Sequence, residues 1–229
     1  MAILLIFEWT RMVDGAEFSR GFYTLSLTAI VTVFVAASGL YGWAILSALV
    51  GGGLATLMEA RRGPSVPWAL AGAVYLVIPA IAALYVRHGP EEGLILTILL
   101  FFTVWATDSG AYLAGCYIGG PKLWPSLSPR KTWAGALGGA LSGLITALVL
   151  GLLLRLPVPM GALVALGLIL PFAAIIGDLL ESALKRVFGV KDTGAAFPGH
   201  GGVLDRLDGF IVAAVALALL VLFGQYAGL

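Results

Sequence analysis

The amino-acid sequence predicts an all-α fold, a polytopic integral membrane bundle of about seven spanning helices with a polar site that faces the cytoplasm. The first observation is composition: 60% of the 229 residues are apolar and 11% are charged, whereas about a quarter of the residues in soluble globular proteins are charged. The second is that the apolar residues form long runs, close to the length of about 20 residues that spans a bilayer. The third is that these runs are continuous and lack the two-residue alternation of a membrane β-barrel.

The predicted spanning helices cover residues 21–38, 40–58, 66–86, 93–115, 133–154, 160–180 and 209–227. Strands are not expected. The first residues, MAILLIFEW, have no basic segment and few apolar residues before Glu8, so they are predicted to be at most the end of a span and not a signal peptide. We expect N-terminal helices over 1–60 and a transmembrane domain over 61–229 that contains the polar site, joined in one integrated membrane domain.

Lysine and arginine are distributed unequally between the two sets of alternate loops. All but two of the thirteen belong to the loops 8–20, 59–65, 119–132 and 181–208, and the exceptions are Arg87 and Arg155. Because cytoplasmic loops carry the excess of these residues, the sequence predicts that these loops lie in the cytoplasm and the C-terminus outside. We expect the membrane to be a bacterial-type inner (cytoplasmic) membrane, with the polar site facing the cytoplasm. Loops 119–132 and 181–208 are therefore predicted to lie on one face.

Several function classes find no support in the composition. A net charge of +1 gives no argument for a nucleic-acid partner, and a single cysteine, Cys116, excludes an internal disulfide framework. Gly135, Gly139 and Gly143 recur at the four-residue spacing that lets helices approach closely in lipid. This spacing leaves open both packing within the chain and the seam of a homodimer.

The fourth apolar run is interrupted by Asp108, and an ionisable residue at such a depth is costly and usually faces a cavity or the bundle interior. Two interpretations remain open. Asp108 either caps a helix that begins at Ser109, or belongs to a break that opens a polar cavity.

Loop 119–132 ends in a segment with the features of an anion site. Ser128, Lys131 and Thr132 stand just before the fifth span, where hydroxyls, a cation and the free N–H groups of a helix N-terminus come together. The alternative is ordinary anchoring by positive charge, which explains Lys122 of the same loop well but the accompanying hydroxyls poorly.

The segment 177–208 is a dense polar insert between two apolar runs. On a helix continuing from the sixth span, Asp178, Glu181, Ser182 and Lys185 share one face. The glycines of the turn 198–202 can bring backbone N–H groups close to a ligand, and two further aspartates follow three residues apart, at positions 205 and 208.

Three carboxylates, those of Asp178, Asp205 and Asp208, are predicted to hold a hard cation such as Mg²⁺, because clustered like charges are costly without one. The number of metal ions stays open. His200 is not expected to ligate metal, since no Cys or His stands at zinc spacing from it. Carboxylates interleaved with lysines and arginines favour phosphoryl transfer, and the alternative is a solvated, salt-bridged loop.

At these residues the chain resembles the phosphatidate cytidylyltransferase (CDP-diacylglycerol synthase) family. The family's C-terminal signature is matched without a gap by Ser182, Lys185, Arg186, Lys191, Asp192, Gly194, Pro198, His200, Gly201, Gly202, Asp205, Arg206 and Asp208. The segments 108–112, 128–132 and 177–182 are similar to its other polar motifs. The chain departs from the family at Ala134, where members often have a polar or acidic residue before the glycine, and in its length. Phe7-Glu8-Trp9 is similar to the family's Glu-Trp at the cytoplasmic end of an early span, which implies that the family's first helices are mostly missing here.

The resemblance implies that CTP and phosphatidate, a membrane lipid, react to give CDP-diacylglycerol and pyrophosphate, with Mg²⁺ required. It implies catalytic roles for Asp178, Asp205, Asp208 and Lys185, the three aspartates as metal ligands. It implies substrate binding by Asp108, Ser128, Lys131, Thr132, Ser182, Arg186, Lys191, Asp192, His200, Gly201, Gly202 and Arg206. Asp205→Asn and Asp208→Asn are each expected to abolish turnover without unfolding the protein.

Two other functions remain as alternatives at this point. A CTP-dependent lipid kinase of related architecture would use similar metal chemistry but release CDP. A secondary transporter would also contain an intramembrane aspartate, but its polar residues would be spread along several spans, whereas here they gather toward one face.

Overall fold

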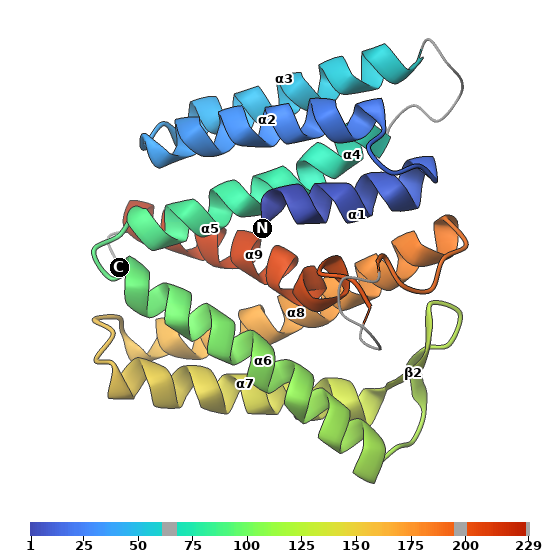
Figure 1. Ribbon diagram of the computed structural model, residues 1–229. Coiled ribbons are helices and arrows are strands. Elements are labelled where there is room, and N and C mark those ends of the chain that lie inside the picture. Colours follow the sequence, from blue (N-terminus) through green and yellow to red (C-terminus); the bar gives the residue numbers. More distant parts are fainter. Residues whose placement is uncertain (61–67, 195–200, 228–229) are drawn as a thin grey trace. The chain divides into compact units, whose positions relative to one another are not determined.

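A computed structural model of the chain describes residues 1–60, 68–194 and 201–227 (Figure 1). The elements are, in order, α1 (Ala2–Asp14), α2 (Arg20–Ala37), α3 (Tyr41–Ala60), α4 (Trp68–Gly72), the π-helical turn η1 (Ala73–Val77), α5 (Ile78–His88), α6 (Gly93–Tyr117), β1 (Lys122–Trp124), β2 (Ser128–Thr132), α7 (Trp133–Leu153), α8 (Met160–Val187) and α9 (Leu204–Ala227). The all-α prediction is confirmed, apart from one small two-stranded sheet.

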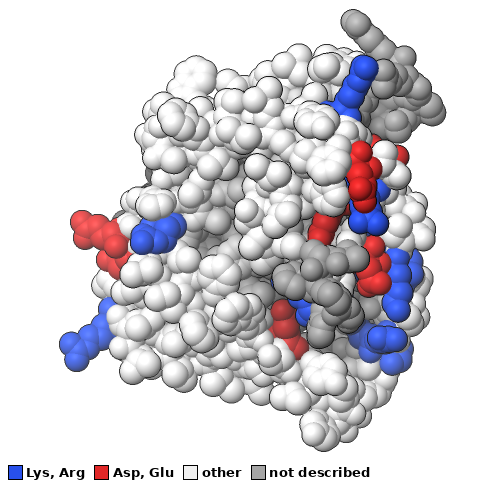
Figure 2. Space-filling model, in the orientation of Figure 1, with Lys and Arg blue, Asp and Glu red and all other residues white. Residues whose placement is uncertain are grey.

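Seven helical segments in the described part of the chain are long and apolar enough to cross a membrane, and each coincides with a predicted span. The third of these is the continuous run α4, η1 and α5. On the face of the molecule that Figure 2 shows, charged side chains are few and most of the surface is uncharged. The N-terminal α1, with 13 residues, is shorter than a span requires.

The chain divides into two compact units, which are described separately. The N-terminal unit consists of Met1–Tyr85 and Leu184–Leu207, and the central unit consists of Val86–Ala183 and Asp208–Leu229. The divisions pass through α8 and α9, so each of these helices contributes residues to both units. The predicted domain limits at residues 60 and 61 stay a prediction.

In the N-terminal unit, small and polar residues let helices approach closely, as is common in membrane bundles. The hydroxyls of Thr32 on α2 and Ser47 on α3 are 2.9 Å apart. A side chain at Gly51 of α3 would collide with Thr28 of α2. Gly51 therefore serves packing within the chain.

The third span widens into a π turn where a proline follows. Pro79 has no N–H to offer the carbonyl of Tyr75, four residues earlier, and the π turn includes that residue. Just before this turn, a Cβ on Gly72 would stand 2.5 Å from the indole nitrogen of Trp9, which donates a hydrogen bond to the carbonyl of Trp68. Helix α1 is thereby fixed against the third span.

In the central unit, α6 and α7 lie side by side and are joined at one end by the β1–β2 hairpin (Figure 1). A side chain at Gly139 of α7 would stand 2.7 Å from the carbonyl oxygen of Thr107 on α6. A side chain at Gly143 would meet Pro171 of α8. Of the two interpretations of the glycine spacing, these contacts support packing within the chain.

Two local expectations were wrong. Helix α6 runs from Gly93 to Tyr117 without interruption, so Asp108 neither caps a helix nor marks a break. Gly110 of the same motif allows close packing, because its Cβ would meet Ser142 of α7. The sheet was also not expected. Strands β1 and β2 pair antiparallel through Lys122 and Thr132 and form a hairpin in loop 119–132, whose prolines predicted only that the loop is not helical.

Candidate active site

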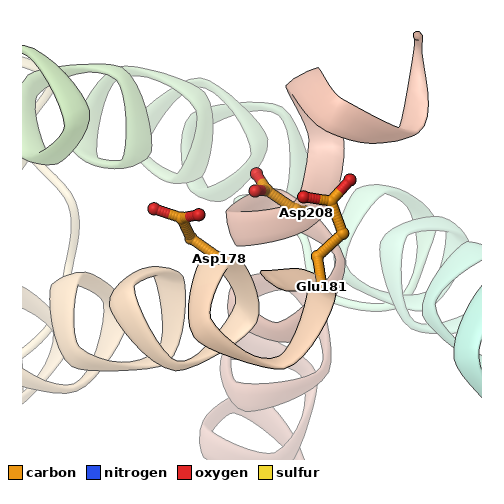
Figure 3. A group of neighbouring side chains, drawn as sticks. All are labelled: Asp178, Glu181 and Asp208. Carbon is orange, nitrogen blue, oxygen red and sulfur yellow. The ribbon is translucent and has the colours of Figure 1, made fainter. Parts of the chain in front are cut away.

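Three carboxylates of the central unit form a cluster that could hold a metal ion. Asp178 and Glu181 project from α8, and Asp208 projects from α9 (Figure 3). Each offers an oxygen that lies within 4.8 Å of the others, and the Glu181 side chain belongs to a residue that is 1% exposed. Three carboxylates at this spacing repel one another strongly in a low dielectric. A set of oxygen donors of this kind fits a hard cation such as Mg²⁺.

Glycine brings the two helices of this cluster together. A Cβ on Gly177 of α8 would collide with the carbonyl oxygen of Asp208 on α9 and stand 3.0 Å from the Cα of Gly209. On the other side, a Cβ on Gly209 would stand 3.1 Å from the carbonyl oxygen of Ala174. The absence of both side chains lets the backbones meet next to the carboxylates.

Replacing Gly177 with alanine is therefore expected to lower the stability of the protein by about 1–3 kcal/mol, as overpacking against backbone does, and to lower activity by displacing Asp208. Thermal unfolding in detergent and initial rates would measure the two effects. Gly161→Ala is the matched control, because Gly161 lies in the first turn of the same helix and a Cβ there meets nothing within 4 Å. Equal melting temperatures for the two variants would contradict this account.

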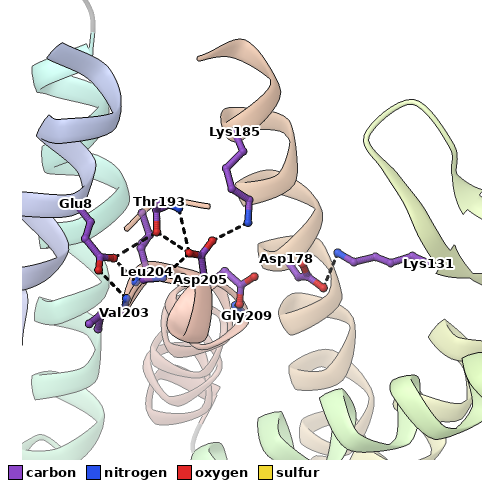
Figure 4. A network of polar contacts seen from close by, with 11 residues as sticks. Glu8, Lys131, Asp178, Lys185, Thr193, Val203, Leu204, Asp205 and Gly209 are labelled. Atoms are coloured by element: carbon purple, nitrogen blue, oxygen red, sulfur yellow. Dashed lines mark hydrogen bonds and ion pairs between the residues drawn. The ribbon is translucent and has the colours of Figure 1, made fainter. Parts of the chain in front are cut away.

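A cation from the hairpin reaches the cluster. The ammonium of Lys131 lies 2.5 Å from a carboxylate oxygen of Asp178 (Figure 4). Successive side chains of a strand point to opposite faces, so the neighbouring Arg130 points away from Lys131 and is exposed. The hairpin thus aims one cation at the carboxylates and one at solvent.

The other residues predicted to bind substrate in the central unit have different surroundings. Thr132 is 4% exposed and its hydroxyl accepts a hydrogen bond from the N–H of Gly135 at 3.1 Å, so it caps α7. Ser128 and Ser182 are half-buried, and Asp108 is exposed on α6. Capping of α7 is a structural reason for the position of the Thr132 hydroxyl. Substrate binding by Thr132, Ser128, Ser182 and Asp108 stays a prediction.

The N-terminal unit contains a second set of charges, centred on Asp205 in the first turn of α9 (Figure 4). One oxygen, Oδ1, accepts a hydrogen bond from the ammonium of Lys185 at 2.8 Å. The other, Oδ2, accepts from the N–H and the hydroxyl of Thr193, each at 3.0 Å, and from the N–H of Gly202 at 2.7 Å. The side chains of Lys185 and Asp205 are 16% and 11% exposed, so this ion pair is largely shielded from water.

These contacts place the three predicted metal ligands in two different sets of charged residues. Asp178 and Asp208 belong to the carboxylate cluster, while four donors surround the carboxylate of Asp205. The N–H of Gly202, which was expected to face a ligand, donates to Asp205 instead. A metal-binding role for Asp205 stays a prediction, as does phosphate binding by Gly202.

The remaining predicted residues of the N-terminal unit are at the surface or on the turn. Arg186, Lys191, Asp192 and Arg206 are exposed, which suits groups that meet a soluble nucleotide. Gly201 has a φ of 80°, a conformation that favours glycine. His200 lies outside the described residues.

Two carboxylates of these clusters were not among the predicted site residues. Glu181 shares a helical face with Asp178 in the sequence, and this spacing was the signal that could have identified it. Glu8 accepts hydrogen bonds from residues of the C-terminal segment. Its sequence signals are a carboxylate within an apolar stretch and the resemblance of Glu8-Trp9 to the family's Glu-Trp, and neither indicates a partner 195 residues away.

The central unit also contains an apolar cavity of about 680 Å³. It is bounded by the start of α6, the connection between α7 and α8, and the end of α9, with Leu96, Leu166 and Phe223 among its lining. No residue of the carboxylate cluster lines it. The cavity is therefore separate from the polar chemistry of the site.

The fold and the charged clusters define a membrane-spanning helical protein in which carboxylates and cations lie close together. A sequence profile described as the cytidylyltransferase family matches residues 1–223. The phosphatidate cytidylyltransferase of Brucella suis is 38% identical over 234 residues, which cover 98% of this chain and 81% of that protein. This chain belongs to the cytidylyltransferase family.

Other relatives match over a shorter region. The phosphatidate cytidylyltransferase of Staphylococcus saprophyticus is 41% identical over 142 residues, or 62% of this chain and 55% of that protein. The phosphatidate cytidylyltransferase of Bacillus subtilis is 41% identical over 126 residues, or 55% of this chain and 47% of that protein. Similarity therefore extends to organisms outside the genus Brucella.

Proposed function

We propose that this chain transfers the cytidylyl group of CTP to phosphatidate, giving CDP-diacylglycerol and pyrophosphate. The observation that carries the proposal is the match to the phosphatidate cytidylyltransferase of Brucella suis over 98% of the chain. Seven apolar helices suit a lipid substrate, and the clustered carboxylates and cations suit a nucleoside triphosphate.

In the proposed reaction, a phosphate oxygen of phosphatidate attacks the α-phosphorus of CTP. A new P–O bond forms, the bond between the α-phosphorus and the bridging oxygen breaks, and pyrophosphate leaves with that oxygen. The lipid phosphate is itself the nucleophile, so no covalent enzyme intermediate is required. The protein's contribution is to position the two phosphates and to offset the negative charge of the transition state.

Asp178, Glu181 and Asp208 would hold the divalent cation in this proposal, with Mg²⁺ as the expected ion. The ion, when bound, would neutralise phosphate charge and help to orient the triphosphate. This assignment adds Glu181 to the ligands expected from the sequence. It is supported by the spacing of the three carboxylates and by their oxygen donors.

The cations are proposed to bind phosphate oxygens. Lys131 already pairs with Asp178, so it can exchange that carboxylate for a phosphate as substrate binds. Arg186, Lys191 and Arg206 are exposed to the water from which a triphosphate arrives, while Lys185 is held beside Asp205. The positive charge of the loops supports a site on the cytoplasmic side of an inner membrane.

The proposal is tested with purified protein in detergent, radiolabelled CTP, phosphatidate and Mg²⁺. We expect labelled CDP-lipid and one pyrophosphate per lipid formed, and a rate at least about 10³-fold lower in excess chelator, because a metal supplies several kcal/mol of charge stabilisation. Release of CDP with a phosphorylated lipid would indicate a kinase instead. Failure to form CDP-lipid, while a cytidylyltransferase from Brucella suis is active in parallel, would reject the assignment.

A further inference from the structure

Glu8 of α1 is a charged residue in an unusual position, because it is only 3% exposed. Its carboxylate accepts hydrogen bonds from three groups of a distant segment. Oε1 accepts from the N–H of Val203 at 2.8 Å, and Oε2 accepts from the N–H of Leu204 at 2.7 Å and from the hydroxyl of Thr193 at 3.3 Å (Figure 4). Glu8 thereby satisfies amides at the start of α9 that have no partner within that helix.

The backbone around Glu8 is built to admit its carboxylate. A Cβ on Gly194 would stand 2.6 Å from Oε1, and a Cβ on Gly202 would stand 2.5 Å from Oε2. Real Cβ atoms essentially never come so close to an oxygen, so both positions require glycine while Glu8 is in place. These glycines therefore have a packing reason that does not involve a substrate.

Thr193 joins Glu8 to the ion pair of Asp205 and Lys185. The threonine hydroxyl lies 3.3 Å from Oε2 of Glu8 and 3.0 Å from Oδ2 of Asp205. A hydroxyl has one hydrogen to donate, so it serves the two carboxylates alternately or shares the hydrogen between them. The two amides that Glu8 accepts from immediately precede Asp205 in the chain.

We propose that Glu8 is a positioning residue, which fixes the start of α9 and Thr193 and thereby holds Asp205 and the ammonium of Lys185 in place for the reaction. The contribution to turnover rests on the proposed function. The geometric part does not, because it concerns only how the N-terminal unit holds Lys185. Positioning partners one step removed from a reacting group typically change activity by about 10–100-fold.

The test compares Glu8→Gln with wild type by two measurements that need no turnover. Glutamine keeps the shape but has one acceptor oxygen, so at least one of the two amides loses its partner. We expect faster hydrogen exchange at the amides of Val203 and Leu204, and faster acylation of Lys185 by an amine-reactive reagent, followed by mass spectrometry. Glu17→Gln is the matched control, since Glu17 is an exposed carboxylate whose oxygen lies 3.8 Å from Arg11.

For activity, we expect kcat of Glu8→Gln to fall about 10–100-fold, while the KM for CTP changes little. Wild-type exchange and wild-type acylation of Lys185 in folded Glu8→Gln would overturn the proposal, whatever the rate. If the wild type made no CDP-lipid, the proposed function would fail, and exchange and acylation would still decide the positioning role.

A second pair of variants covers the case in which Glu8→Gln does not fold. Thr193→Val removes the shared hydroxyl but leaves the amide contacts of Glu8, and Thr193→Ser keeps the hydroxyl. We expect faster acylation of Lys185 in the valine variant and wild-type behaviour in the serine variant. Identical acylation in all three proteins would overturn the proposal.

Discussion

Asp208→Asn is expected to lower the rate of CDP-lipid formation by at least about 10³-fold, because it removes one anionic ligand from the cluster with Asp178 and Glu181. The protein should remain folded. Asparagine keeps an oxygen at Oδ1, which accepts the hydrogen bond from the N–H of Gly209 at 2.7 Å. Removing one of three clustered negative charges also relieves repulsion in the metal-free protein.

Two measurements separate loss of metal from loss of fold. Thermal unfolding without metal should give a melting temperature at or above that of wild type, and Mn²⁺ binding followed by electron paramagnetic resonance should weaken. Glu91→Gln is the control, because Glu91 is an exposed carboxylate of the central unit that does not belong to the cluster. Near-normal rates of Asp208→Asn at saturating Mg²⁺ would rule out Asp208 as a metal ligand.

Asp205→Asn is expected to have a different main effect, a loss of stability of about 3 kcal/mol. The substitution leaves the ammonium of Lys185 largely buried without this carboxylate, and removing one partner of a buried ion pair is strongly destabilising. An asparagine side chain at this position could also satisfy fewer of the donors on Thr193 and Gly202. The structure thus revises the expectation, drawn from the sequence, that this variant loses turnover without any effect on folding.

The control for Asp205→Asn is again Glu17→Gln, this time for its ion pair with Arg11. The side chains of Arg11 and Glu17 are 46% and 61% exposed, and exposed pairs contribute about 0–1 kcal/mol. The comparison is made by thermal unfolding in detergent. A wild-type melting temperature for Asp205→Asn, together with a rate restored by raised Mg²⁺, would show instead that Asp205 binds the metal.

The sequence alone determined the membrane-spanning architecture, because span length and apolar composition are properties of continuous segments. It also determined that Asp178 and Lys185 share a face of α8, since helical periodicity follows from spacing alone. The motif residues 182–208 led to the correct family for the same reason: their spacing is local and uninterrupted. Nothing about distant packing was needed for any of these.

The tertiary structure determined which charged side chains are in contact. The spacing in the sequence places Asp205 and Asp208 near each other on α9. In the structure, α8 approaches α9 closely at Gly177 and Asp208 lies in the carboxylate cluster, whereas Asp205 accepts hydrogen bonds from Lys185 and Thr193. Asp108 likewise lies within an unbroken helix, α6, which packs against α7. The role inferred for Glu8 depends on contacts between segments at opposite ends of the chain. Such contacts are fixed by helix packing, which local patterns of residues do not encode.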